Sequence, residues 1–349
     1  MSMMRALAIL AAVAWLCVAC GSEDDTATGG AGTGASATGG SGATHTGGSG
    51  ATHTGGSGAA AGGGSTPTGG GGSGAGGLTD PNECADPESA WVFCCDFETG
   101  DFSPWDDYDG NPAPDNTIQD EPGPFGLSGN HVARLRVPAG RGGADMVKLL
   151  PASDRLYTRW YVQWEPGFDM NAPNHGSGLH AGDRNYLGQS DYRPQGDDFF
   201  SGWIEHTTDT HQLNAYSYSR GMYMDCADPN GQCWGDHFPC MIDEGEVYCT
   251  KAQHRETVNP PVMVTGQWYC IEMTMDGGTP STDGSITDGQ LDFWVDGLEI
   301  GPWTDLWLRT TADLKLDVLW LSLFHHGEHS VEGMFFDNVV VSTERIGCP

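Results

Sequence analysis

Residues 79–349 alternate apolar and polar side chains with a period of two, and hardly any stretch repeats at helical spacing. In 156–164, leucine, threonine, tryptophan, valine and tryptophan occupy every second position. Similar alternation occurs in 132–137, 199–205, 213–218, 268–275, 291–295, 318–324 and 334–341. Because the side chains of a strand point alternately to the two faces of a sheet, this pattern predicts a domain built almost entirely of strands with one buried face.

The lengths of the strands and loops narrow the fold class further. Asp296-Gly297, between the apolar segments 291–295 and 298–300, is a strong signal for a two-residue hairpin. Residues 79–349 are enough for one large domain with a substantial core. Many strands joined by long irregular loops favour two packed antiparallel sheets over a small immunoglobulin-type domain. We therefore predict an all-β fold, a two-sheet antiparallel β-sandwich.

The first nineteen residues have the features of an export signal. Arg5 supplies a positive charge, residues 6–18 form an apolar run too short to span a bilayer comfortably, and Ala19 is the small residue before cleavage. The segment 16–20 resembles a bacterial lipobox, which implies that Cys20 becomes the first mature residue and carries acyl chains. Cys17 stands where such boxes usually have leucine, so simple secretion is the alternative. The expected location is the bacterial cell envelope, with the membrane contacted through the lipid anchor alone.

A linker follows the predicted anchor. Residues 20–78 are rich in Gly, Ser, Ala and Thr, and one octet occurs twice, at 39–46 and 47–54. Such a segment cannot build a core. As a flexible coil it would span on the order of 40 Å. We expect it to tether the folded domain, 79–349, away from the membrane.

The charge of the chain excludes several partner classes. Removal of Arg5 with the signal leaves 14 Lys plus Arg against 47 Asp plus Glu, a net charge of 14 − 47 = −33. Such a field repels polyanions, so nucleic acid and anionic lipid headgroups are excluded as partners. A polyanionic glycan would need a locally positive cleft.

The domain contains nine cysteines, which export would keep oxidised. Their spacing suggests local loops closed by Cys226 with Cys233 and by Cys240 with Cys249. A further bridge would join Cys348 to Cys270 or Cys84, and one of the adjacent Cys94 and Cys95 would stay unpaired. Zinc binding is the competing use, but no Cys-x-x-Cys pair occurs among these nine cysteines.

Several segments, in their order along the chain, resemble polysaccharide lyases. They are Cys95-Asp-Phe-Glu98, 157–162, the Gly-rich turn Asn174-His-Gly-Ser-Gly-Leu179, Phe200-Ser201, Ala215-Tyr-Ser-Tyr218, 266–268, 288–297, 323–327 and 336–342. The domain is similar to the concanavalin A-like jelly rolls of the alginate and glucuronan lyase families. This resemblance implies a jelly roll whose concave groove handles a polysaccharide.

The resemblance also assigns candidate site residues. The Gly-rich turn of these lyases usually presents a lysine, a position that His175 takes here. Tyr216 and Tyr218 match the paired tyrosines on a later strand, where alternation puts both rings on one face. Ser201 matches a groove serine, and Trp203 stands where a basic residue is expected. The resemblance thus implies catalysis by His175, Tyr216 and Tyr218, with Ser201 and Trp203 binding substrate.

A lyase must neutralise the uronate carboxylate, abstract the adjacent proton and protonate the leaving oxygen. A tyrosine base needs a nearby cation near neutral pH, and His175 supplies charge only when protonated. Loss of the fixed cations weakens the case for a polyuronate. The main prediction is β-elimination, and the alternative is a non-catalytic carbohydrate-binding lipoprotein that uses the same groove. Glycoside hydrolysis needs two facing carboxylates, for which Glu205 is the one nearby candidate.

Three carboxylates resemble a structural calcium site. Asp96 and Glu98 lie at the first expected strand of the domain and Asp337 lies at the last. The first and last strands are commonly neighbours in concanavalin A-like sandwiches. Carboxylate oxygens suit Ca²⁺, and a solvated acidic edge is the alternative.

A histidine cluster lies near the C-terminus. His325 and His326 are expected to line the glycan groove. Together with Glu328 and His329 they could instead bind a transition metal, but they lack the helical His-Glu-x-x-His pattern.

Overall fold

The computed structural model describes residues 82–109, 116–140, 142–189, 192–223, 234–243, 246–248, 259–326 and 330–348. All described residues belong to one compact unit, Gly72–Pro349. The predicted signal peptide, Cys20 and the linker lie outside the described residues. Within those residues, no helix is both long and apolar enough to cross a membrane.

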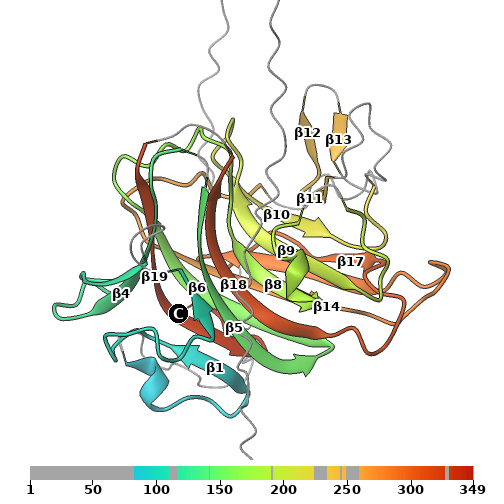
Figure 1. Ribbon diagram of the computed structural model, residues 1–349, viewed down its shortest axis with the longest axis horizontal. Coiled ribbons are helices and arrows are strands. Elements are labelled where there is room, and N and C mark those ends of the chain that lie inside the picture. The colour runs from blue at the N-terminus through green and yellow to red at the C-terminus, as the bar shows by residue number, and fades with distance from the viewer. Residues whose placement is uncertain are drawn as a thin grey trace, which may run out of the picture. The chain divides into compact units, whose positions relative to one another are not determined.

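Two antiparallel sheets make up the domain, which confirms the predicted fold class (Figure 1). The nine-stranded sheet has the order β16-β15-β14-β6-β19-β4-β3, with β1 paired to β19 and β17 paired to β15. Its strands are β1 (Trp91–Cys95), β3 (Thr117–Asp120), β4 (His131–Val137), β6 (Arg155–Trp164), β14 (Tyr269–Asp276), β15 (Gly289–Val295), β16 (Leu298–Glu299), β17 (Trp303–Leu306) and β19 (Glu332–Ser342).

The eight-stranded sheet carries the candidate site. Its order is β11-β10-β9-β8-β18-β5-β2, and β7 also pairs with β18. Its strands are β2 (Asp107–Tyr108), β5 (Gly142–Ser153), β7 (Asn174–His175), β8 (Ser177–Gly182), β9 (Phe199–His206), β10 (Leu213–Tyr218), β11 (Asp236–Phe238) and β18 (Leu316–His325). The short 3₁₀ helices η1 (Glu83–Ala85) and η2 (Arg184–Tyr186) and a separate ribbon, β12 (Met241–Asp243) with β13 (Glu246–Tyr248), complete the described elements.

The core lies between the two sheets. Fully buried side chains from both sheets form one cluster, which includes Leu135, Trp160, Phe200, Phe293 and Phe336. Strand alternation turns the neighbours of these residues to the outer faces. On the eight-stranded sheet, that outer face is also aromatic and forms a second cluster.

The alternating segments all form strands, within about two residues of the predicted bounds. The predicted hairpin is also present, because β15 and β16 are joined by Asp296 and Gly297 with φ of 48° and 81°. The longest strand, β5, was not predicted, since its sequence contains two glycines and a proline and does not alternate.

The expected Gly-rich turn at 174–179 is wrong, because this segment forms β7 and β8. A Cβ on Gly176 would lie 1.9 Å from the backbone oxygen of Ile204, and one on Gly178 would lie 2.1 Å from that of Gly202. The glycines therefore permit close contact with β9 instead of a reversal of the chain.

Two disulfides join described cysteines. Cys270 bonds to Cys348, one of the two pairings predicted for the C-terminus, and Cys84 bonds to Cys94. Cys95 is unpaired and buried, as expected for one member of the adjacent pair. Cys240 is disulfide-bonded. Its predicted partner, Cys249, and the predicted pair Cys226 and Cys233 lie outside the described residues.

Candidate functional site

The outer face of the eight-stranded sheet carries an aromatic cluster. Trp203 on β9 and Tyr216 and Tyr218 on β10 pack there with Trp320 of β18. Tyr216 lies opposite Trp203, and Tyr218 lies opposite Ser201, in the register of β9 and β10. The structure therefore brings the predicted tyrosines, the tryptophan and the serine together on one face.

A cavity of about 280 Å³ opens at one end of this face. We call it the histidine pocket. Its lining includes four histidines and two acidic residues: His175, His206, His237, His326, Glu205 and Asp209. Cavities of about this size and larger hold small ligands, so the pocket is the candidate binding site.

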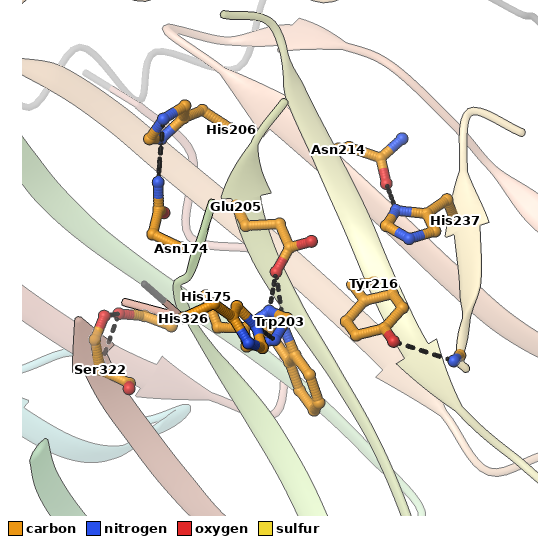
Figure 2. A network of polar contacts seen from close by, with 12 residues as sticks. Asn174, His175, Trp203, Glu205, His206, Asn214, Tyr216, His237, Ser322 and His326 are labelled. Atoms are coloured by element: carbon orange, nitrogen blue, oxygen red, sulfur yellow. Dashed lines mark hydrogen bonds and ion pairs between the residues drawn. The ribbon is translucent and has the colours of Figure 1, made fainter. Parts of the chain in front are cut away.

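Glu205 is the hub of polar contacts in the pocket (Figure 2). Its Oε2 lies 2.7 Å from His175 Nδ1 and accepts a hydrogen bond of 2.9 Å from Trp203 Nε1. An ionised carboxylate can only accept, so the His175 proton must be on Nδ1. The contact orients the imidazole with Nε2 facing away from Glu205.

His326 meets that second nitrogen. The Nε2 atoms of His175 and His326 lie 2.7 Å apart, and their rings are nearly perpendicular at 78°. Such a contact holds one proton between two nitrogens, so one ring donates and the other accepts. Glu205, His175 and His326 therefore form a chain along which a proton can move.

Burial acts to raise the pKa of Glu205. Attraction to His175 and His237, together with the hydrogen bonds from His175 and Trp203, outweighs this effect, so the pKa of Glu205 lies below its usual 4.5. Burial lowers the pKa of His237 and of His206 to about 4. At neutral pH the pocket therefore holds an ionised glutamate beside two neutral histidines.

The paired tyrosines lie beneath His175 and do not line the pocket. The Tyr216 ring stacks on the His175 ring at 5.4 Å, and its hydroxyl contacts that of Tyr218 at 3.1 Å and accepts a hydrogen bond from Gly235 N. Burial raises the pKa of Tyr216 well above its usual 10, and Tyr218 adds to this effect. The Tyr216 phenol thus stays protonated, which suits a hydrogen-bond donor and not a base.

Two predicted binding residues are also covered. Ser201 and Trp203 are 3% and 4% exposed. The indole donates to Glu205 and packs edge-on to Tyr216 and Trp320, so it supports the pocket instead of presenting a flat face to a sugar. The backbone oxygen of Ser201 accepts a hydrogen bond from Ser217 Oγ.

The two C-terminal histidines separate. His326 lines the pocket, whereas His325 is fully buried outside it. His325 Nε2 lies 3.1 Å from Glu332, and its ring packs against Phe168. Strand alternation gives the reason, since His325 ends β18 on the core side.

The three predicted calcium ligands lie around the junction of β1 and β19. Cys95 of β1 pairs with Val339 of β19, so the first and last strands are neighbours as expected. Burial raises the pKa of Asp337 well above its usual range, and the nearby charges of Glu98 and Asp96 add to the effect. In the described part of the chain, no three His, Cys, Asp or Glu side chains are grouped closely enough to hold a metal ion.

His237 and Asn214 were not among the residues predicted from the sequence. His237 Nδ1 lies 2.7 Å from Asn214 Oδ1, and its ring stacks on Tyr216 at 4.4 Å. Alternation could have placed Asn214 on the face of Tyr216. No sequence signal pairs His237 with Tyr216, because that neighbour relation depends on the register of β10 and β11.

Comparison with known proteins identifies the fold. No family model and no curated protein matches the chain. An alginate lyase from Chlorella virus is 14% identical over 73% of this chain and 100% of its own, with a TM-score of 0.52. A marine PL-14 alginate lyase from Aplysia kurodai is 14% identical with the same coverages and a TM-score of 0.50. A glucuronan lyase from the fungus Trichoderma reesei is 14% identical over 74% of this chain and 98% of its own, with a TM-score of 0.47. The chain therefore shares the β-sandwich fold of the two alginate lyases.

Proposed function

We propose that the histidine pocket cleaves a uronate-containing polysaccharide by β-elimination. One observation carries the proposal: His175 is held by Glu205 on one nitrogen and faces His326 with the other, at the wall of a pocket. A histidine oriented by a carboxylate is a common general base. The shared fold with two alginate lyases supports the same reaction class.

In this mechanism His175 Nε2 takes the proton from C5 of the uronate. The electron pair of the C5–H bond forms the C4=C5 double bond, and the C4–O4 bond breaks. His326 gives a proton to the departing O4. Glu205 stabilises the positive charge that develops on His175. The 2.7 Å contact between the two Nε2 atoms then returns the proton from His175 to His326 and resets the site.

This mechanism changes the role expected for the tyrosines. The Tyr216 hydroxyl is buried and bonded to Gly235 N and Tyr218. Its phenol stays protonated, so Tyr216 positions His175 by stacking and does not abstract the proton.

The test follows the unsaturated product by ultraviolet absorbance, together with reducing ends, on a panel of polysaccharides. The protein is the mature chain from residue 20, with Cys20→Ser to prevent acylation. We expect an ultraviolet signal that His175→Ala and His326→Ala each abolish. Glu272→Gln is the matched control, because Glu272 is a buried strand glutamate in the other sheet, bonded to Ile346 and Gly347. Reducing ends without the ultraviolet signal would indicate a hydrolase.

Glycan binding without cleavage is the second candidate. The observation that favours it is the burial of Ser201, Trp203, Tyr216 and Tyr218, which leaves the histidine pocket as the accessible part of the predicted site. Retention on a glycan column without any product would select this function.

We also propose a calcium ion near Asp337. Asn130 Nδ2 donates to Asp337 Oδ2 at 2.9 Å, while the buried Asn130 Oδ1 has no hydrogen-bond partner. Amide and carboxylate oxygens bind Ca²⁺ together, so Asp337 and Asn130 would hold the ion, and the nearby Asp96 and Glu98 would add negative charge. The ion would offset the charge of the buried Asp337 carboxylate.

Anchoring at the cell surface through Cys20 completes the proposal. The sequence of the first twenty residues supports it. Mass spectrometry of the N-terminal peptide from the native host would show acylated Cys20, and Cys20→Ser would release the protein from the membrane fraction.

A further inference from the structure

The charges of the histidine pocket restrict the sugar that it can take. No lysine or arginine is among its described lining residues, whereas Glu205 and Asp209 are both acidic. Glu205 is buried, and its carboxylate already accepts hydrogen bonds from His175 and Trp203. A uronate carboxylate placed beside His175 would therefore meet a second negative charge and, among the described lining residues, no fixed positive one.

The histidines do not replace the missing cations near neutral pH. His237 and His206 are neutral there, because burial lowers the pKa of each to about 4. His175 and His326 share one proton between their Nε2 atoms. At 2.7 Å only one of the two Nε2 atoms can carry the hydrogen, so at least one of the rings is uncharged there, and Glu205 already contacts the other nitrogen of His175.

The walls beside His175 offer an apolar surface instead. Pro173 lines the pocket next to His175, and the Phe324 ring lies behind His175, stacked on its imidazole with centroids 6.1 Å apart. The Pro173 ring would contact a small alkyl group attached to the sugar carboxyl.

The chemistry of elimination agrees with an uncharged carboxyl derivative. Abstraction of the C5 proton from a carboxylate creates a second negative charge on the same group, which a cation must neutralise. An ester or amide starts neutral, so its C5 proton is more acidic and a neutral imidazole is an adequate base.

We propose that the histidine pocket takes polysaccharides whose uronate carboxyl groups are esterified or amidated, in preference to the free acids. This inference rests on the proposed function and names its substrate class. The bonds that form and break are those of the β-elimination above, and no co-reactant is needed.

The experiment compares matched polymers that differ in the carboxyl group alone. The probes are methyl-esterified polygalacturonate with its saponified form, and propylene glycol alginate with alginate, at pH 7 and low salt. Initial rates of unsaturated product and retention on immobilised polymer are measured side by side with the mature Cys20→Ser chain. We expect at least a tenfold higher kcat/KM and tighter binding for the ester in one of the pairs.

Each outcome separates the inference from the proposed function. Equal or faster cleavage of the free acids overturns the inference and keeps the lyase. Binding of an ester without product overturns the lyase and keeps the ligand class. Equal or tighter binding of the free acids without product overturns both, as does no binding to either form.

A charge placed in the pocket gives an independent check. Thr208 lines the pocket, so Thr208→Lys supplies the missing cation near the bound carboxyl. We expect the ratio of ester to free-acid cleavage to fall at least fivefold in this variant. Thr208→Met is the matched control of similar length without charge, and it should keep the parent ratio. An unchanged ratio in Thr208→Lys would contradict the inference.

Discussion

Glu205 can be tested by separating its charge from its hydrogen bonds. Glu205→Gln keeps an oxygen that can accept from both His175 Nδ1 and Trp203 Nε1 but removes the negative charge. Glu205→Leu removes charge and acceptor together and leaves the buried Trp203 Nε1–H and the part-buried His175 Nδ1–H without this partner. The two variants therefore differ in one interaction type.

The expected magnitudes follow from the two contacts of 2.7 and 2.9 Å. A hydrogen bond to a charged group contributes about 1.5–3 kcal/mol and a neutral one about 0.5–1.5 kcal/mol, so Glu205→Gln should lose about 1–1.5 kcal/mol per bond and about 2–3 kcal/mol in all. Each unsatisfied buried donor costs about 1–3 kcal/mol, so Glu205→Leu should lose about 2–6 kcal/mol. The corresponding fall in Tm is roughly 2–4 °C per kcal/mol.

The loss in Glu205→Gln should also depend on pH. Because the pKa of Glu205 is lowered in the folded protein, its stabilisation is complete above its unfolded value near 4.5 and is lost as the pH falls through the folded value. The difference in unfolding free energy between parent and variant should therefore stay constant from pH 7 to about 4.5 and shrink at lower pH. A difference that grows at low pH would refute the ionised state of Glu205.

The assay combines urea unfolding with ¹⁵N NMR of the imidazole nitrogens. The parent and Glu205→Gln should both show the Nδ1–H tautomer of His175. In the parent, the charged hydrogen bond should favour this tautomer over the Nε2–H tautomer by about 10- to 150-fold. Glu205→Leu should lose the preference. Glu272→Gln should lower stability without changing the His175 spectrum. An Nε2–H form in the parent protein would refute the proposed orientation of the base.

Three further perturbations test other parts of the molecule. Burial raises the pKa of Asp145 to about 6, so ionisation of this half-buried carboxyl costs up to about 3 kcal/mol at pH 7. In urea unfolding, Asp145→Asn should therefore be more stable than the parent at pH 7.5 but not at pH 4. Equal effects at both pH values would contradict this. When Ca²⁺ is present at a hundredfold excess over its Kd, its removal with EDTA should cost about 2.7 kcal/mol of stability, seen as a lower Tm. Asp337→Asn should abolish this response. A parent protein whose Tm does not respond to EDTA or Ca²⁺ would exclude the ion. Replacing Cys270 and Cys348 by alanine opens a loop of 78 residues and should lower the free energy of unfolding by about 4 kcal/mol, measured by chemical unfolding under oxidising conditions. A loss below 1 kcal/mol would show that the C-terminus stays bound to the domain without the disulfide.

Local patterns predicted eight of the longer strands and little of the pocket. Period-two alternation identified β6, β9 and β10 because each of them has one face in the core. The same reasoning failed at 174–179, where Gly176 and Gly178 serve contact with β9, a requirement that no residue in the segment reveals.

The sequence alone determined the strand content, the Asp296-Gly297 hairpin and the presence of His175, Tyr216 and Tyr218 among the candidate residues, because these depend on local periodicity, turn chemistry and motif order. The tertiary structure decided what those residues can do. His175 meets Glu205, 30 residues away, and His326, 151 residues away, because β7 lies beside β18 and close to β9. The same packing buries Tyr216 and keeps its phenol protonated, so the candidate base is a histidine. Burial and neighbouring charge set the ionisation of a side chain, and both arise only when distant strands meet.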